Sequence, residues 1–489
     1  MSKSREGYLW TETNLSQGLA TQAVISSTTN LKPSYDVIVI GAGFAGLRAA
    51  RELSRHYRLS VLIIEGRDRI GGRTWTAQAF GEDFEMGGTW VHWNQPHLYA
   101  ELHRYNLHKY LKSSAGTIAT QKTYYKGAGG GVQEIDGNTL AGITQAVAEK
   151  FFTIDGLSSR ELYPYPHDPF RAPAPWKKYD HLTVRQRLDQ LDLPTLHKGY
   201  FESTVNSFGS APSTEIGFIE ALRWYALGGH NMAQVLELAG IYKLGKGGMT
   251  SFSRSILQDA QSDILLDTVI SEVIQNDPSG AVVRSKNGRT FKAKAVICTV
   301  PLNCLSDVKF SPPLSPLKSE AIVKGHINKG AKIHFKLTST EPGWFAACDG
   351  YSTSSFCFAF SDHNGTSRAG PRGTYCIGFG YSGCLQDPRD SKHILEEFKK
   401  DLRPDAKVEG YLTHDWMNDP LAKGVWSCWG SHSITKYLQE LQKAHGNVFF
   451  ASADWADGWR GFIDGALESG LKTAQIVAEK LNTSPGPRL

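Results

Sequence analysis

The chain has 489 residues, of which 40% are hydrophobic and 11% aromatic, so it can bury large cores and should divide into more than one lobe. The formal net charge of +5 is small for this length, and Lys and Arg are scattered, which argues against a nucleic-acid-binding protein. No run of about 20 apolar residues occurs, so no membrane span is predicted. The seven cysteines form no C-x-x-C pair, a pattern typical of reduced thiols in an intracellular compartment rather than of disulfides or zinc.

The N-terminal segment, residues 1–34, is rich in Ser, Thr, Gln and Asn and is predicted to be a loosely held arm. Residues 35–40 form an aliphatic, β-branched run that predicts a strand buried on both faces. Helix formers follow in 45–55, and 59–64 is a second aliphatic run that ends at Glu65, a residue placed to accept hydrogen bonds from a ribose. Strand, G-x-G-x-x-G turn, helix, strand and acidic residue thus follow in the order of a dinucleotide-binding unit.

The glycines of this unit each have a physical task in holding a nucleotide. Gly41 makes the tight turn, and Gly43 has no Cβ to block a pyrophosphate. Gly46 lets helix and strand pack closely, while the backbone N–H groups at Phe44 and Ala45 face phosphate oxygens. The glycines alone would equally suit a turn in an unrelated βαβ unit, and the complete order favours the nucleotide.

Two further glycine segments follow, "GRDRIGGRTW" at 66–75 and "FEMGGTWVHW" at 84–93. In this order after a complete fingerprint, they make the chain resemble the flavin-containing amine oxidases, with the closest likeness to fungal monoamine oxidases. The resemblance implies FAD rather than NAD as the cofactor. The residues that match its cofactor-binding positions here are Arg67, Gly72, Arg73, Gly87, Gly88, Thr89 and Trp90.

Later segments extend the resemblance to about residue 480. Val269, in "LLDTVISEV", matches a valine whose backbone meets the adenine. Asp454 stands where many members carry Glu, and the resemblance implies that it accepts a hydrogen bond from the ribityl chain. Ile463 begins a predicted helix whose N-terminus would face the flavin and pyrophosphate.

The implied fold class is α/β: a two-lobed amine oxidase fold with a Rossmann-like FAD domain and a mixed α+β substrate domain. The proline-rich stretch 163–176 is predicted to be a connector. The active site is expected where the two lobes meet. The expected division is an N-terminal arm at 1–34, a discontinuous FAD-binding domain at 35–94, 240–306 and 414–482, a substrate domain at 95–239 and 307–413, and a C-terminal tail at 483–489.

Three residues are implied by the resemblance to carry the chemistry. Trp426 and Phe462 match the two aromatic residues that flank the amine, and Lys332 matches a lysine that holds a water against the flavin. An apolar Trp–Phe pair in place of the Tyr pair of many members suggests hydrophobic amines. Val425 stands where mitochondrial relatives carry the cysteine that tethers the flavin, and Cys428 lies three residues further on, so non-covalent FAD is expected.

The resemblance implies oxidation of primary, or alternatively secondary, hydrophobic amines by O2 to aldehyde or imine, ammonia and hydrogen peroxide. A polyamine oxidase, or another flavin oxidase or desaturase of the same fold, remains the alternative, because fold does not fix function. A histone demethylase is a third reading, disfavoured because the chain has no long heptad insertion. The oligomeric state stays open, a homo-oligomer included.

Four histidines, at positions 92, 97, 103 and 108, invite a metal-binding interpretation. Their spacings of five and six residues place no neighbouring pair on one helical face, so no metal is predicted. At the other end of the chain, Pro487, Arg488 and Leu489 resemble a peroxisomal S-K-L signal in the basic and final positions. Peroxisomal and cytoplasmic locations are both kept, because Pro487 departs from the small residue expected there.

Overall fold

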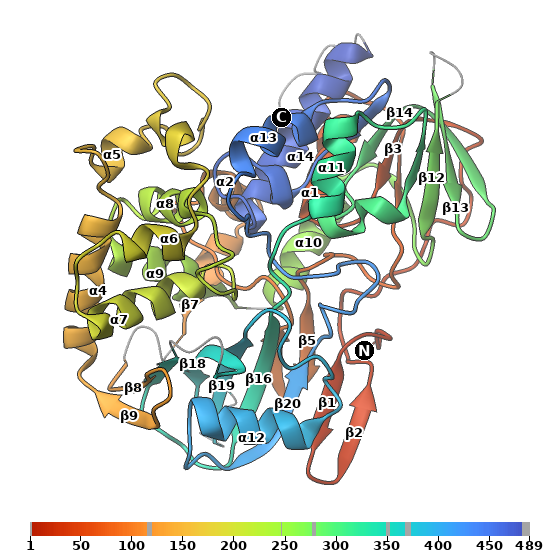
Figure 1. Ribbon diagram of the computed structural model, residues 1–489. Helices are drawn as coiled ribbons and strands as arrows, with labels where there is room; N and C mark the ends of the chain where they lie inside the picture. Colours follow the sequence, from red (N-terminus) through yellow and green to blue (C-terminus); the bar gives the residue numbers. More distant parts are fainter. Residues whose placement is uncertain are drawn as a thin grey trace.

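The computed structural model describes residues 2–114, 120–245, 247–275, 280–348, 353–366 and 373–481. The predicted C-terminal signal therefore lies outside the described residues. Most described strands gather in two large sheets, one in the upper part of Figure 1 and one in the lower part, and helices α4 to α9 stand at one side of both.

The upper sheet is built on the predicted nucleotide-binding unit. β3 (Tyr35–Ile40) and β4 (Val61–Ile64) pair in parallel, and α1 (Phe44–Arg55) connects them. Alternate residues of 37–40 in β3 point into two separate hydrophobic clusters, one on each face, which explains the aliphatic sequence of this part of the strand. In this sheet, β21 (Val448–Phe450) pairs with β14 (Thr290–Cys298) beside the main strand order. That order is β11 (Asp263–Leu265), β4, β3, β14, β13 (Ala281–Ser285), β12 (Ile270–Ile274) and β15 (Lys309–Ser311).

The predicted C-terminal strand, loop and helix are present as β21 and α14 (Ile463–Lys480). α14 packs directly on α1, and a Cβ at Gly470 would lie only 2.3 Å from the carbonyl oxygen of Ala45. This close approach needs a glycine, because no side chain fits between the two backbones. The contact brings the N-termini of α1 and α14 together on the side of the cavity described below.

The lower sheet presents one face toward the helices α4 to α9. Its strand β16 pairs antiparallel with β19, and the register places Lys332 directly opposite Phe379. Within the described residues the order is β2 (Asn14–Gln17), β1 (Tyr8–Thr11), β20 (Val408–Thr413), β16 (Ala331–Leu337), β19 (Thr374–Gly380), β18 (Phe356–His363), β17 (Trp344–Cys348), β8 (Lys122–Lys126) and β9 (Val132–Ile135).

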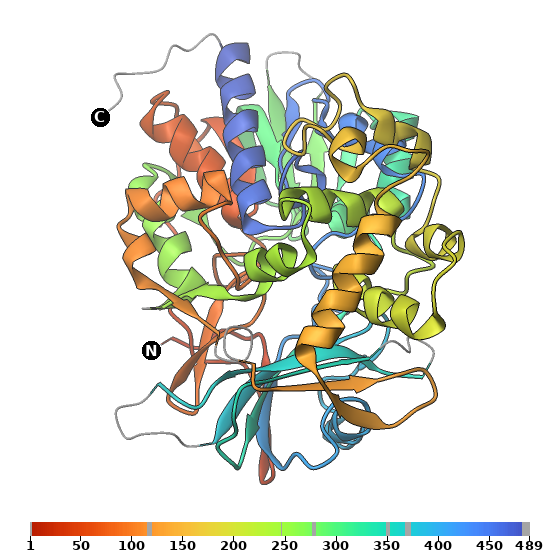
Figure 2. The same cartoon turned by 90° about the vertical axis from the view of Figure 1, so that its left-hand side faces the viewer.

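Helices and short hairpins complete the fold. Figure 2 shows α4, the long orange helix, rising from the lower sheet toward the upper part of the molecule. The proline-rich connector runs between α5 and α6, as predicted. The other described α-helices and strands are α2 (Pro96–Arg104), α4 (Gly137–Phe151), α5 (Ser159–Leu162), α6 (Val184–Asp189), α7 (Thr195–Asn206), α8 (Phe218–Leu227), α9 (Met232–Gly240), α10 (Gly248–Asp259), α11 (Pro316–Lys324), α12 (Ser391–Asp401), α13 (Ile434–Gln442), β5 (Thr76–Ala79), β6 (Glu82–Glu85), β7 (Leu111–Ser113) and β10 (Tyr242–Leu244).

The N-terminal segment differs from the prediction of a loosely held arm. β1 and β2 form a hairpin, and β1 pairs with β20 so that the hairpin extends the lower sheet. Trp10 stacks on Tyr411 with ring centroids 5.3 Å apart. The prediction was wrong for residues 8–17, because the polar composition of the segment hid a short aromatic strand that finds its partner about 400 residues away.

Two elements also depart from the expected division of the chain. β15 pairs with β12 of the upper sheet, although the expected nucleotide segment ends at residue 306. α2 belongs to an expected substrate segment, but it packs on α14, and its Leu98 N–H donates to Asp464 at 2.8 Å. The remaining domain boundaries stay predictions. In the described part of the chain, no helix has both the length and the apolar character needed to span a bilayer.

Candidate active site

A cavity of about 1300 Å³ lies between the two sheets and the helices α4, α7 and α9. It takes in nearly all of the residues that the sequence singled out. Among the described residues, only Gly46 and Asp454 of that set do not line it. The predicted residues on its wall are Gly41, Gly43, Phe44, Ala45, Glu65, Arg67, Gly72, Arg73, Gly87, Gly88, Thr89, Trp90, Val269, Lys332, Trp426, Phe462 and Ile463.

The glycine turn after β3 has the geometry that a phosphate cradle requires. Gly41 has φ +109°, which side chains rarely adopt, and its carbonyl oxygen would lie 2.1 Å from a Cβ at Gly46. Gly46 is therefore a packing residue behind the wall. A Cβ at Gly43 would come no closer than 4.0 Å to Gly72, so the space in front of this turn is open to a ligand. The start of α1 offers its N–H groups to that space.

Glu65 lies at the end of β4 on the wall of this cradle. Its two carboxylate oxygens accept the backbone N–H groups of Ala42 at 2.6 Å and Arg67 at 2.9 Å. Burial raises the pKa of Glu65 above its usual range. Each oxygen keeps a further lone pair, so the carboxyl group suits the hydroxyls of a ribose. Cradle, acid and helix N-terminus together fit the pyrophosphate and ribose of FAD.

The two predicted arginines have different partners. The guanidinium of Arg67 pairs with Asp419 at 2.7 Å and with Glu6, so it ties the loop to the N-terminal hairpin region. Arg73 donates to the carbonyl oxygen of Val425 at 2.7 Å and pairs with Asp454 at 2.8 Å. Both contribute to the cavity wall, but their charged groups are already neutralised by protein carboxylates.

Asp454 differs from its predicted place. It is fully buried behind the wall, where one carboxylate oxygen pairs with Arg73 and the other accepts the N–H of Leu302 at 2.9 Å. Its ionised form is favoured, because these partners outweigh burial and lower its pKa. Asp454 therefore orients Arg73, and no ribityl contact is supported by its position.

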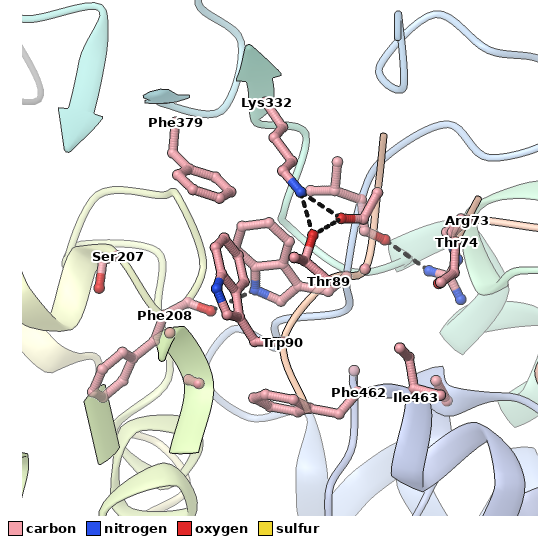
Figure 3. Close-up of a pocket in the computed structure, with 18 of the residues that line it drawn as sticks. Arg73, Thr74, Thr89, Trp90, Ser207, Phe208, Lys332, Phe379, Phe462 and Ile463 are labelled. Atoms are coloured by element: carbon pink, nitrogen blue, oxygen red, sulfur yellow. Dashed lines mark hydrogen bonds between the residues drawn. The ribbon is translucent and has the colours of Figure 1, made fainter. Parts of the chain in front are cut away.

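Lys332 enters the cavity from β16. Figure 3 shows its amino group directed at Thr89, with Trp90 and Phe379 close by and Phe462 and Ile463 across the cavity. Its Nζ donates to the carbonyl oxygens of Glu85 at 2.8 Å and Gly87 at 2.7 Å and to the Thr89 hydroxyl. Burial lowers the pKa of this lysine.

The two predicted aromatic residues share the cavity with Lys332. The indole N–H of Trp426 donates to the Phe208 carbonyl at 2.7 Å, and its ring lies 5.9 Å from that of Phe379. The ring of Phe462 contacts that of Trp224 at 4.8 Å. Hydrogen bonding and ring contacts therefore fix both side chains on the wall.

Sequence reasoning missed an aromatic wall on the lower sheet, formed by Phe345, Phe358, Phe360 and Phe379. The rings of Phe358 and Phe379 stack 4.6 Å apart with planes 13° from parallel. Phenylalanine at alternate positions in "FCFAF" was a signal for one aromatic face. That signal alone would have been misleading, because the β18–β19 register shifts after Phe356, which packs in the core on the opposite face instead.

A family model for flavin containing amine oxidoreductases matches residues 44–478. The chain belongs to this family. A pseudooxynicotine dehydrogenase from a Pseudomonas species is 35% identical over 455 residues, which cover 91% of this chain and 87% of the relative. A nicotine dehydrogenase of Pseudomonas putida is 30% identical, with 92% of this chain and 89% of the relative covered.

Solved structures of amine oxidases share the fold. A putrescine oxidase variant superposes with a TM-score of 0.76 at 20% identity, covering 91% of this chain and 99% of the other. Cyclohexylamine oxidase from Brevibacterium oxydans gives a TM-score of 0.72 at 22% identity, covering 92% and 100%. The predicted two-lobed fold and enzyme family are thus confirmed. The special likeness to fungal monoamine oxidases stays a prediction.

Three of the four histidines at positions 92, 97, 103 and 108 contact other side chains, and the expected absence of a metal there stays a prediction. His92 Nε2 lies 3.7 Å from a Glu237 carboxylate oxygen, and the rings of His103 and His108 stack 4.3 Å apart. Elsewhere in the described residues, one group has ligand-like spacing, formed by Glu6, His414 and Asp419. The Arg67 guanidinium pairs with both acids of this group, and His414 Nε2 lies 2.7 Å from Asp419, so these residues form an ion-pair network.

Asp464, at the start of α14, predicts a pH dependence of stability. One of its oxygens accepts the Leu98 N–H, and the other has no partner in the described part of the molecule. Burial raises the pKa of Asp464 to about 7. The folded state therefore holds a proton that the unfolded state releases near pH 4, and the protein should lose stability as pH rises from about 4 to about 7.

We expect Asp464→Asn to remove that loss, because the amide is neutral at every pH and keeps the oxygen that accepts from Leu98. Thermal unfolding at pH 5 should be nearly unchanged, whereas at pH 8 the variant should unfold a few degrees higher than the parent. The exposed Asp405→Asn serves as the control. Parallel pH profiles for parent and Asp464→Asn would contradict the assignment.

Proposed function

We propose that this protein oxidises a hydrophobic primary or secondary amine with non-covalent FAD and passes the electrons to O2. The products would be an imine, which water converts to a carbonyl compound and the released amine or ammonia, and hydrogen peroxide. The observation that supports this is a single cavity that joins the glycine cradle to Lys332 and to the aromatic residues. Bound FAD would supply the acceptor for the hydride equivalent from the carbon next to nitrogen.

The residues of the chain would bind and orient the amine. The apolar rings of Trp426, Phe462 and the aromatic wall disfavour an ammonium ion, so the amine is held neutral with its lone pair available. The fixed positions of these rings limit the approach of the substrate to one direction. Lys332, whose three N–H bonds are taken by Glu85, Gly87 and Thr89, presents its positive charge to the same space.

The substrate class follows from the lining and from the relatives. The wall next to Lys332 is aromatic, whereas the acids that line the cavity come from elsewhere: Glu134 and Asp136 from the β9–α4 region, Glu237 from α9, Glu65 from the cradle and Asp307 from the segment before β15. A relative named (S)-6-hydroxynicotine oxidase, 27% identical, joins the two Pseudomonas proteins already described. We therefore propose an amine that carries an aromatic ring, ahead of a linear polyamine.

The test is reduction of the bound flavin by the amine in the absence of air. It is monitored through the loss of the absorbance of the oxidised flavin. Benzylamine, nicotine and pseudooxynicotine are expected to reduce it at least tenfold faster than putrescine or a methylated histone peptide. On admission of air, one peroxide should form per amine consumed. Putrescine as the best reductant would favour a polyamine oxidase. Flavin that stays reduced in air would contradict O2 as the acceptor, an outcome that the relatives named dehydrogenases make worth measuring.

Acid precipitation should release the flavin completely into the supernatant. Val425 lines the cavity at the tether position and has no nucleophile, while Cys428 is buried against Gly209 and is not on the wall. Burial also raises the pKa of Cys428 far above its usual range, so its thiol is unreactive. Yellow colour that remains with the denatured pellet would show a covalent bond.

Peroxisomal import through the last three residues stays a proposal, tested by fusing them to a fluorescent protein.

A further inference from the structure

Glu85, the last residue of β6, is a buried carboxylate outside the cavity. It is 7% exposed, and its carboxylate accepts the Met249 N–H at 2.8 Å and the Thr76 hydroxyl at 3.1 Å. Met249 lies in the first turn of α10, a helix of 12 residues. A carboxylate at a helix N-terminus is stabilised by the unpaired N–H groups and the helix dipole. The carboxyl group of Glu85 is thereby held in a fixed position.

The backbone of the same residue contacts Lys332. The Glu85 carbonyl oxygen accepts a hydrogen bond from Lys332 Nζ at 2.8 Å and lies 2.8 Å from His334 Nε2. Lys332 lines the cavity and Glu85 does not. Glu85 is thus placed to act on the cavity only through the lysine in front of it.

A count of the charges around Lys332 identifies its counter-charge. On β10 and β18, Lys243 pairs with both carboxylate oxygens of Asp362, and this ammonium holds the pKa of Asp362 well below its usual range despite burial. These two charges cancel. His334 is neutral, because burial lowers its pKa to about 3. Glu85 is then the carboxylate that remains for Lys332.

Burial acts on the remaining pair in opposite directions. It lowers the pKa of Lys332 and raises the pKa of Glu85, so burial alone would favour both neutral forms. The attraction between the two charges opposes this effect in each case. Removal of one charge therefore weakens the ionisation of the other.

We propose that Glu85 is the positioning residue of Lys332: its carboxylate, held at the N-terminus of α10, is the counter-charge that keeps the cavity lysine ionised. The effect of Glu85 on amine oxidation rests on the proposed function, whereas the interaction between Glu85 and Lys332 does not. The pH range in which the enzyme works would then be set from outside the cavity, by a residue that touches neither substrate nor cofactor.

Glu85→Gln tests the proposal, because its carbonyl oxygen can still accept the Met249 N–H. The protonation of Lys332 is read directly in the flavin-loaded enzyme from ¹³C-enriched lysine side chains, and its resonance is assigned by its absence in Lys332→Met. We expect the titration midpoint of Lys332 to fall by about one pH unit or more in Glu85→Gln. Glu85→Asp, which keeps the charge, should leave the titration midpoint of Lys332 close to that of the parent. Glu82→Gln on the same strand is the control, since the Glu82 carboxylate instead pairs with Thr366.

The pH profile of flavin reduction by the best amine provides the second measurement. The limb of this profile that is set by the ionisation of Lys332 should move to lower pH in Glu85→Gln. It should stay in place in Glu82→Gln. An unchanged midpoint in folded Glu85→Gln would overturn the proposal. A shifted midpoint in a protein that oxidises no amine would leave the pairing standing and refute the proposed function. If Glu85→Gln is not recovered folded, Thr76→Val removes a donor to the carboxylate, and the Lys332 midpoint must then fall as well.

Discussion

Gly46→Ala is expected to purify without flavin. The added Cβ would lie 2.1 Å from the carbonyl oxygen of Gly41, a backbone atom that cannot rotate away, so β3 and α1 must separate at the cradle. Overpacking of this kind costs about 3 kcal/mol, which corresponds to a roughly 100-fold weaker affinity for FAD. The measurement is the ratio of flavin to protein after gel filtration, followed by titration of the apoprotein with FAD.

Gly142→Ala provides the matched control, because Gly142 also lies inside a helix, α4, and a Cβ there meets nothing within 4 Å. It should bind FAD normally and be slightly more stable, by about 0.4–1 kcal/mol. A flavin-replete Gly46→Ala protein would show that the turn can open without loss of the site, and that the cradle is not formed as described.

Lys332→Met is expected to keep its FAD and lose most of its activity. Methionine has nearly the length of lysine but no charge and no N–H, so the cavity loses the cation that lies beside the Trp90 ring. Removal of one preorganised electrostatic group from a water-excluded site costs about 100- to 1000-fold in rate. We expect kcat/KM for the best amine to fall by that factor, with flavin content unchanged.

The control lies four residues further along β16. Lys336 pairs with Glu409 at 2.7 Å, outside the cavity, and Lys336→Met should retain full activity. Equal activities of the two variants would place Lys332 among structural residues. Loss of FAD from Lys332→Met would point in the same direction, because the three oxygens that its amino group satisfies belong to residues 85–89, which include the third glycine pair.

The nucleotide half of the molecule was predictable because its requirements are local. Only a glycine adopts the φ of Gly41, and only a glycine fits between helix and strand at Gly46, so the spacing of these residues carries the geometry directly. An unbroken aliphatic run likewise specifies a strand covered on both faces. The strand, turn, helix and strand around the cradle were therefore found within one to two residues of their ends.

Contacts between distant segments decided the rest. Asp454 has the right residue type for a cofactor contact, yet Arg73, 381 residues earlier, takes its carboxylate and leaves it behind the wall. The hairpin at residues 8–17 is polar by composition, and only its pairing with β20 makes it part of a sheet. Such outcomes depend on which surfaces meet after folding, and no local pattern encodes them.

The same division holds for the active site. By itself, the sequence determined the family, the flavin cradle and the apolar character of the two aromatic residues, because each rests on residue type and spacing. The tertiary structure alone decided that the backbone oxygens of Glu85 and Gly87 hold Lys332 and that Glu85, 247 residues away in sequence, stands behind it. The physical reason is that the charge state of a buried lysine depends on the groups packed around it, and these come from β6, β10 and β18, which only the folded chain brings together.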